Sequence, residues 1–155
     1  MIRDDNRASV VTVLPIEMAD VFSKRKRSQV MSSIRSSGNK ATELAAIRIF
    51  RKQKIKGWRR QVLLPGKPDF VFRQQRVAVF IDGCFWHFCP RHGRCPASNE
   101  SYWTAKLQRN RQRDRQVSGA LRSKGWKVLR VWEHDLKHPA LLGNRLRRAI
   151  LEEQK

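Results

Sequence analysis

The sequence predicts an α/β fold in which helices flank a mixed central sheet. Segments whose apolar residues recur every three or four positions alternate with short apolar runs bounded by turn residues. The 155 residues suit one domain and can bury a core. We expect that domain to span residues 18–155. Residues 1–17 precede a second Met and are expected to form a mobile N-terminal extension.

Two helices and a strand are expected in the first part of the domain. Ser23 can cap a short basic helix over residues 23–34. Apolar side chains at helical spacing predict a second helix over residues 41–54, and Gly57 ends that segment. Residues 58–64 alternate enough between apolar and polar side chains to predict a strand.

A hairpin, an irregular loop and a long helix follow. The apolar runs 69–72 and 77–81 are separated by four polar residues, which is typical of a hairpin, here with a buried second arm. Residues 83–98 are rich in Cys, His, Gly and Pro and predict an irregular loop. A helix is expected over residues 100–124, with Gly125 as its stop.

The last two expected elements are a strand over residues 127–132 and an amphipathic helix over residues 140–152. The complete order is then α, α, β, β, β, loop, α, β, α. Its αβββαβ part is similar to that of restriction-endonuclease-like nucleases. This resemblance implies a core of that type around the mixed central sheet.

The charge of the chain indicates a polyanionic partner. Thirty-four Lys and Arg face 13 Asp and Glu, which gives a net charge of +21. Such a charge disfavours an enzyme for small neutral substrates and favours nucleic acid over membrane. No apolar run approaches the roughly 20 residues that span a bilayer, so no membrane partner is expected.

The cysteines indicate the compartment. Cys84, Cys89 and Cys95 are an odd number within one short segment, which is unlike a secreted disulfide framework. The apolar stretch at residues 10–16 is too short and too acidic at its front to be read as a signal peptide. We therefore expect a reducing, cytoplasmic location.

Three carboxylates are candidates for a catalytic magnesium site. Asp69 begins the first arm of the hairpin and Asp82 ends the second, so both can approach one edge of the sheet. Glu43, in the first turn of the second predicted helix, can reach the same place. Hard oxygen ligands suit Mg²⁺, which shares substrate phosphates and helps to generate hydroxide. The alternative is that all three are ordinary turn or helix-end residues.

The loop over residues 83–98 carries candidate zinc ligands. Cys84, Cys89, His92 and Cys95 lie within it, and His134 lies just beyond the last strand. Zn²⁺ takes four such ligands, so Cys95 and His134 compete for the last place, and the zinc would brace the loop. The alternative is that some of them are free thiols or surface imidazoles.

The same loop carries a candidate base and candidate wedge residues. His87 can serve as a general base near a metal-bound phosphate, or it is a partly buried hydrogen-bonding histidine. Phe85, Trp86 and Trp103 can insert between base steps, which is least costly at mismatched sites, or they belong to the core. We expect the wedge role, because a short loop cannot easily bury two large rings and also bind zinc.

Basic residues of the long predicted helix are candidates for contacts with the DNA backbone. They alternate around the helix and cannot share one face, so some are solvated and some meet phosphate. These residues are Lys106, Arg109, Arg111, Arg113 and Arg115, and a second basic cluster is Lys24–Arg27.

Four ordered motifs resemble the very short patch repair endonucleases. The match runs from about Met18 to His134. The motifs are Pro65-Gly-Lys-Pro-Asp69-Phe-Val71, Phe80-Ile-Asp-Gly-Cys-Phe-Trp-His87, Tyr102-Trp103 followed by Lys106, Asn110 and Asp114-Arg115, and Gly125-Trp126 through Glu133.

The resemblance implies a Mg²⁺-dependent endonuclease that nicks one strand of double-stranded DNA beside a T:G mismatch, as left by deamination of 5-methylcytosine. It assigns the metal to Asp69 and to the backbone carbonyl of Ile81, and catalysis to His87, with Glu43 near the active site. The remaining roles follow in the same way: Phe85, Trp86 and Trp103 as the wedge, and Cys84, Cys89, His92 and His134 as structural zinc ligands.

One departure from the family is at Asp82, which stands where its best-known type has a histidine and which bears on metal binding or proton transfer. The resemblance further implies a bacterial, nucleoid-associated monomer, with mismatch-repair proteins as candidate partners. Two alternatives stay open: a restriction-type nuclease of the same fold that cuts unmodified sites, and a non-catalytic, zinc-stabilised DNA-binding module. The enzymatic interpretation requires Asp69 and His87 to converge on one phosphodiester.

Overall fold

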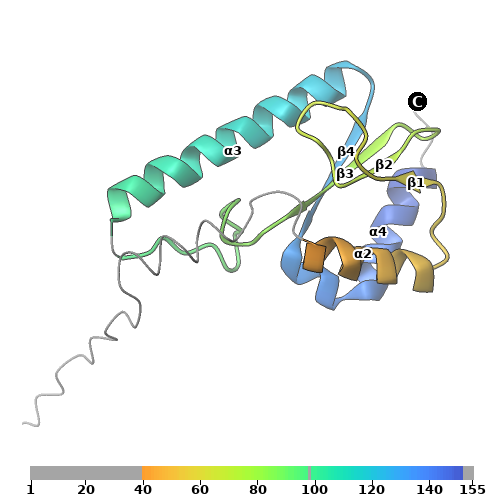
Figure 1. The fold of residues 1–155 in the computed structure, drawn as a ribbon, viewed down its shortest axis with the longest axis horizontal. Coiled ribbons are helices and arrows are strands. Elements are labelled where there is room, and N and C mark those ends of the chain that lie inside the picture. Colours follow the sequence, from red (N-terminus) through yellow and green to blue (C-terminus); the bar gives the residue numbers. More distant parts are fainter. Residues whose placement is uncertain (1–39, 98, 152–155) are drawn as a thin grey trace, which may run out of the picture. The chain divides into compact units, whose positions relative to one another are not determined.

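The computed structural model of the protein describes residues 40–97 and 99–151 (Figure 1). The extension at 1–17, the helix expected over 23–34 and the Lys24–Arg27 cluster lie outside the described residues. The described elements are α2 (Lys40–Lys52), β1 (Trp58–Arg59), β2 (Phe70–Phe72), β3 (Val77–Asp82), α3 (Glu100–Ser123), β4 (Lys127–Trp132), a 3-10 helix η1 (Glu133–Lys137) and α4 (Pro139–Leu151). This order confirms the expected αβββαβ sequence of elements.

The four strands form one mixed sheet in the order β1-β2-β3-β4. β2 and β3 form the predicted antiparallel hairpin, with Phe70 opposite Val79. β4 runs parallel to β3 along its whole length, from Val77 opposite Lys127 to Asp82 opposite Trp132. Because parallel strands end at the same sheet edge, the residues after β3 and after β4 emerge side by side.

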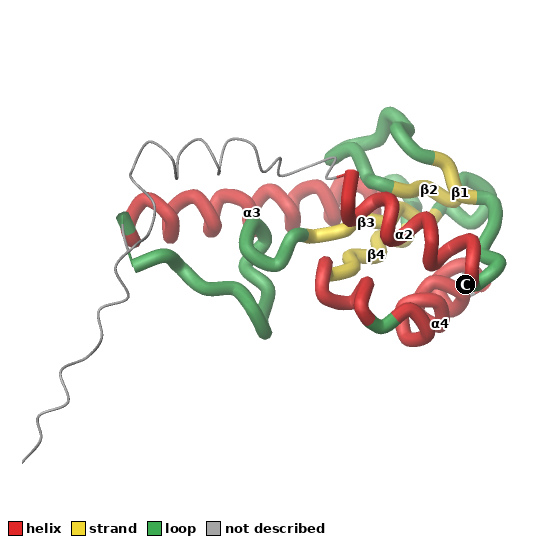
Figure 2. Tube along the Cα trace, turned by 60° about the horizontal axis from the view of Figure 1, so that its bottom comes forward, coloured by secondary structure: helices red, strands yellow, loops and turns green. Residues whose placement is uncertain are grey.

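Alternate residues of β3 pack against different helices, so the sheet has a helical layer on each face (Figures 1 and 2). Val77 and Val79 belong to a core built with α2 and α4. Ala78 and Phe80 pack instead with Leu121 of α3. The period of two along a strand therefore sends Asp82 to the α3 side.

The strand expected over residues 58–64 is wrong beyond Arg59. Only Trp58 and Arg59 pair with β2. Gln61 has φ 54°, in the left-handed region, which interrupts an extended backbone. The rest of the segment runs as a loop to Pro68.

The long helix and the last strand match their expected limits closely. α3 ends at Ser123, and Gly125 follows with φ 75°, a conformation that glycine adopts without strain. The sequence did not predict η1, which directly follows β4 and is held by Asp135, whose Oδ2 accepts from the Trp132 backbone N–H at 3.1 Å. Within the described ranges, no helix has the length and apolar character needed to cross a bilayer.

Candidate active site

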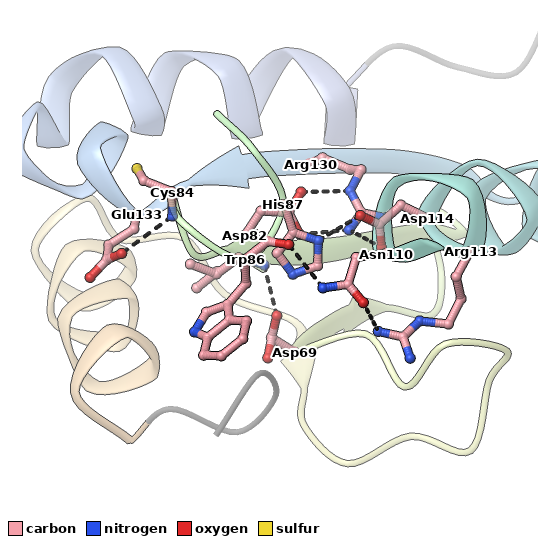
Figure 3. A network of polar contacts seen from close by, with 11 residues as sticks. Asp69, Asp82, Cys84, Trp86, His87, Asn110, Arg113, Asp114, Arg130 and Glu133 are labelled. Carbon is pink, nitrogen blue, oxygen red and sulfur yellow. Dashed lines mark hydrogen bonds and ion pairs between the residues drawn. The ribbon is translucent and has the colours of Figure 1, made fainter. Parts of the chain in front are cut away.

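The hairpin places Asp69 and Asp82 near each other at one edge of the sheet (Figure 3). The Ile81 backbone N–H donates to Asp69 Oδ2 at 2.7 Å, which joins the start of β2 to the end of β3. The pKa of Asp69 is raised to about 6, chiefly by burial and further by the negative charges of Glu43 and Asp82, against the lowering effect of the Ile81 hydrogen bond. Glu43 and Asp82 therefore both lie within electrostatic range of Asp69.

Arginines neutralise two of these carboxylates. Glu43 is buried and forms an ion pair with Arg60. Asp82 is only 3% exposed, and both of its oxygens accept from Arg130, at 2.6 Å from Nε and 2.6 Å from Nη2. Among the described residues, no basic side chain forms an ion pair with Asp69. Of the three carboxylates, Asp69 is the one that no arginine of the described residues neutralises.

His87 lies in the loop after β3, with its ring against α3. Its Nδ1 is 2.5 Å from Asp114 Oδ2 and 3.9 Å from Asp82 Oδ1. An ionised carboxylate only accepts hydrogen bonds, so Nδ1 donates to Asp114, and whenever the ring carries a single proton Nε2 presents a lone pair. His87 lies beside Asp82, and the charge of Asp82 acts on Asp69. His87 and Asp69 therefore lie in the same region and not on opposite sides of the molecule (Figure 3).

Asp114 is held in its ionised form. Burial acts to raise its pKa, but the hydrogen bond to His87 and the charges of His87, Arg130 and Arg113 outweigh burial and lower the pKa. Arg130 Nη2 lies 3.0 Å from Asp114 Oδ1. Asp114 can therefore orient the His87 imidazole and stabilise its protonated form.

Sequence reasoning assigned no role to Asn110, Asp114 or Arg130. Asn110 Nδ2 donates to the Trp86 backbone carbonyl at 3.0 Å and so ties the loop to α3. Asn110 and Asp114 are partly buried one turn apart, on the inward face that also holds Leu107 and Leu121. The sequence did contain a signal for Asn110 and Asp114, because both are polar residues at inward positions of an otherwise apolar helical stripe.

The structure brings together Cys84, Cys89, His92 and His134, whose ligand atoms all lie within 4.8 Å of one another. Cys84 Sγ is 3.2 Å from His134 Nδ1, and Cys89 Sγ is 3.6 Å from the same atom. A tetrahedral zinc ion would place such atoms about 3.3–3.8 Å apart. Two thiols and two imidazoles are also the donors that zinc prefers. The group therefore fits a metal ion of this kind.

His134, and not Cys95, completes this group. Cys95 Sγ lies instead 3.5 Å from Thr104 Oγ1 and 3.7 Å from the Glu100 backbone oxygen. His134 Nε2 is 3.4 Å from Asp135 Oδ1, a contact that would orient the ring as a ligand. Burial, followed by the neighbouring Cys89 thiol, raises the pKa of Cys84. A bound cation would counter that effect and hold the thiolate.

The aromatic candidates form one ring cluster between the loop and α3. Ring centroids are 5.1 Å apart for Phe85 and Trp86, and 5.4 Å apart for Phe85 and Trp103. Trp86 is 8% exposed and Trp103 is 7% exposed. The expectation that the loop could not bury its rings and also gather metal ligands is therefore wrong for Trp86, because α3 supplies a packing surface.

Basic side chains surround this cluster. Lys106 Nζ lies 5.3 Å from the Trp86 ring centroid and 5.4 Å from that of Trp103, within cation–π range. The four arginines of which some were expected to meet phosphate are all exposed on α3: Arg109, Arg111, Arg113 and Arg115. The surface of α3 beside the candidate site is thus strongly cationic.

Comparisons of the sequence with a family model and with individual proteins agree on one family. Residues 19–92 match the family described as DNA mismatch endonuclease Vsr. The chain is 36% identical to the DNA mismatch endonuclease Vsr of Escherichia coli strain K12 over 125 residues, 77% of each protein. It is 35% identical to the type II nicking enzyme V.NmeDIP of Neisseria meningitidis serogroup C, over 87% of this chain and 93% of that protein. The type II nicking enzyme V.NaeI of Lentzea aerocolonigenes is 64% identical over a shorter stretch, 44% of this chain and 42% of that protein.

Proposed function

Because the chain belongs to the DNA mismatch endonuclease Vsr family, we propose that it is a DNA endonuclease that nicks one strand of a duplex beside a T:G mismatch. Such mismatches arise when 5-methylcytosine is deaminated. The observation that carries the proposal is the proximity of Asp69, which has no ion-pair partner among the described residues, to an oriented imidazole, His87. A protein that only binds DNA needs neither group. The αβββαβ core, of restriction-endonuclease type, would present both to the same phosphodiester.

Asp69 and the backbone carbonyl of Ile81 would hold the catalytic Mg²⁺. Carboxylate and carbonyl oxygens are the hard donors that this ion prefers. When bound, the ion would offset negative charge on the scissile phosphate. Because Arg130 occupies both oxygens of Asp82, we assign Asp82 no contact with the metal.

His87 would act as the general base. Its Nε2 takes a proton from the attacking water as the water oxygen bonds to phosphorus, and the imidazolium that forms is stabilised by Asp114 Oδ2 at Nδ1. The bond from phosphorus to the leaving sugar oxygen then breaks. Glu43 stays paired with Arg60 and shapes the potential around Asp69.

The ring cluster would supply selectivity for the mismatch. Phe85, Trp86 and Trp103 pack together. Phe85 is only partly buried, so its ring would lead the wedge, backed by the two buried tryptophans. Unstacking a base step costs a few kcal/mol and is least costly where pairing is already weak. The exposed α3 arginines Arg109, Arg113 and Arg115, with Lys106, would hold the backbone, which predicts an affinity that falls steeply with salt.

The Cys84–Cys89–His92–His134 group would bind structural zinc and so fix the loop that carries His87 and the wedge. The ligand atoms come from two places in the chain, so the ion would tie the loop after β3 to η1. We treat this ion as structural because all four donor positions are filled by protein.

An end-labelled nicking assay with Mg²⁺ tests the proposal. A T:G duplex should be cut in one strand at a single position, faster than a matched duplex of the same sequence. Equal cutting of the matched duplex would favour a restriction-type nuclease. Tight binding of the T:G duplex without cutting would favour a zinc-stabilised DNA-binding module, and either result would contradict the proposed activity.

Replacing Asp114 by Asn should lower the single-turnover nicking rate by about 10²-fold, because a freely turning imidazole is misplaced for proton transfer. The affinity for DNA should stay nearly unchanged, since Asp114 faces His87 and Arg130. Glu100→Gln is the matched control: it also removes a carboxylate from α3, but at an exposed position in the first turn. A full nicking rate in Asp114→Asn would remove Asp114 from the account.

A further inference from the structure

A partly buried arginine connects the three elements that carry the candidate site. Arg130 lies within β4, Asp82 ends β3 and Asp114 lies on α3. Figure 3 shows the guanidinium between the two carboxylates, with the His87 ring beside them. The side chains of Arg130, Asp82 and Asp114 are 24%, 4% and 19% exposed, so this is an internal network and not a surface ion pair.

Within this network each carboxylate oxygen of Asp82 and Asp114 has its own partner, Arg130 or His87. Asp82 uses both oxygens on Arg130, through Nε and Nη2, each at 2.6 Å. Arg130 Nη2 also reaches Asp114 Oδ1 at 3.0 Å, and Asp114 Oδ2 is left for His87 Nδ1 at 2.5 Å. A planar guanidinium suits such an arrangement, because its donors lie in one plane at set angles.

Two carboxylates compete for His87 in principle. Its Nδ1 is 3.9 Å from Asp82 Oδ1, and a modest turn of the ring would bring the two atoms into hydrogen-bond range. Arg130 prevents this exchange because it holds Asp82. It also neutralises one negative charge close to where an anionic phosphate must approach.

Arg130 is partly withdrawn from solvent. Its guanidinium lies 4.9 Å from the Phe80 ring centroid, beneath the sheet residues that face α3. Removing this cation from water is costly unless the charge is matched. Asp82 and Asp114 supply the matching negative charges.

We propose that Arg130 is a positioning residue of the nicking reaction: it holds Asp82 and one oxygen of Asp114, and thereby leaves Asp114 Oδ2 as the partner of His87. This inference rests on the proposed endonuclease function. In the proposed mechanism Arg130 contacts neither DNA nor metal. It affects the nicking rate by fixing the orientation of the His87 imidazole.

Single-turnover nicking of a T:G duplex with enzyme in excess separates rate from binding. Arg130→Gln should lower the rate by about 10²-fold, with the DNA dissociation constant changed by no more than about twofold. Arg130→Lys keeps the positive charge but loses the planar guanidinium with its several donors. Its nicking rate should therefore lie between those of the wild type and Arg130→Gln. Arg122→Gln is the matched control, because Arg122 is an exposed arginine in the last turn of α3 with no role in the site.

A second variant distinguishes the proposed effect on rate from a loss of folding. Arg130→Gln leaves Asp82 buried without its partner, whereas Asp82→Asn/Arg130→Gln leaves no unmatched charge. The double variant should recover about tenfold of the lost rate, because the competing carboxylate is gone. A double variant no faster than a folded Arg130→Gln protein would overturn the proposed competition.

A spectroscopic measurement separates this inference from the function itself. The Nδ1-bound proton of His87 should give a strongly downfield NMR signal in the wild-type protein and in Arg122→Gln, and that signal should shift or vanish in Arg130→Gln. If the wild type shows the signal but does not cut DNA, the endonuclease proposal fails alone. If Arg130→Gln cuts at the wild-type rate, or keeps the His87 signal unchanged, the role of Arg130 fails alone.

Discussion

Asp69→Asn is expected to reduce nicking on the order of 10³-fold or more, because it removes the carboxylate that would hold the metal on the scissile phosphate. Asn keeps an oxygen that can accept from the Ile81 N–H, so the start of β2 should stay in place. Single-turnover rates with Mg²⁺, compared with the binding of the same T:G duplex, measure the effect. Binding should be retained while cutting is lost.

The same substitution should stabilise the metal-free protein. The pKa of Asp69 is raised from an ordinary 3.8 to about 6, so the folded state binds this proton more tightly than the unfolded state. The resulting penalty is absent below pH 3.8, grows as pH rises, and is fully present above pH 6. At pH 7, Asp69→Asn should therefore raise the free energy of unfolding by about 1–3 kcal/mol.

Urea unfolding in a chelating buffer checks this sign. The advantage of Asp69→Asn should be present at pH 7 and should shrink toward zero near pH 4. A variant that is less stable than the wild type at pH 7, and equally so at pH 4, would mean that Asp69 is not a destabilised carboxylate. A gain in stability coupled to a loss of activity is expected where a charge is kept for function.

Cys89→Ser is expected to destabilise the protein by at least about 5 kcal/mol, through loss of the metal that joins the loop to η1. Cys89 is 1% exposed and lies between both histidines of the group. Metal analysis should give about one equivalent of zinc for the wild type and much less for Cys89→Ser. A zinc chelator should lower the melting temperature of the wild type alone.

Cys95→Ser is the matched control for that experiment. It makes the same chemical change in the same loop, but its thiol faces Thr104 and lies outside the metal group. Cys95→Ser should keep both the zinc and the wild-type melting temperature. Zinc lost from Cys95→Ser but retained by Cys89→Ser would reverse the assignment.

Local patterns were enough to predict most elements of the fold. The hairpin, α3 and β4 have strong periodicity and clear end signals, and they appear where expected. The strand predicted after α2 was too long, because Gln61 adopts a left-handed conformation that its residue type does not reveal. The helix η1 was missed because its five residues are too short to show a period.

The candidate site was less predictable because it depends on which strands are neighbours. The sequence could not choose between Cys95 and His134. The parallel pairing of β3 with β4 brings Cys84 and His134 to one edge of the sheet, and that pairing is a tertiary property. Arg130 was missed for the same reason, since only the sheet order places it beside Asp82.

We propose that Asp69 would hold a metal ion that offsets negative charge on the phosphate that is cut. The most direct test replaces one nonbridging oxygen of that phosphate with sulfur, in each stereoisomer, at the position located by the nicking assay. We expect one stereoisomer to be cut slowly with Mg²⁺, softer Mn²⁺ or Cd²⁺ to restore cutting, and Asp69→Asn to show no restoration. Both stereoisomers cut at the oxygen rate with Mg²⁺, or full cutting without any divalent metal, would contradict this role of Asp69.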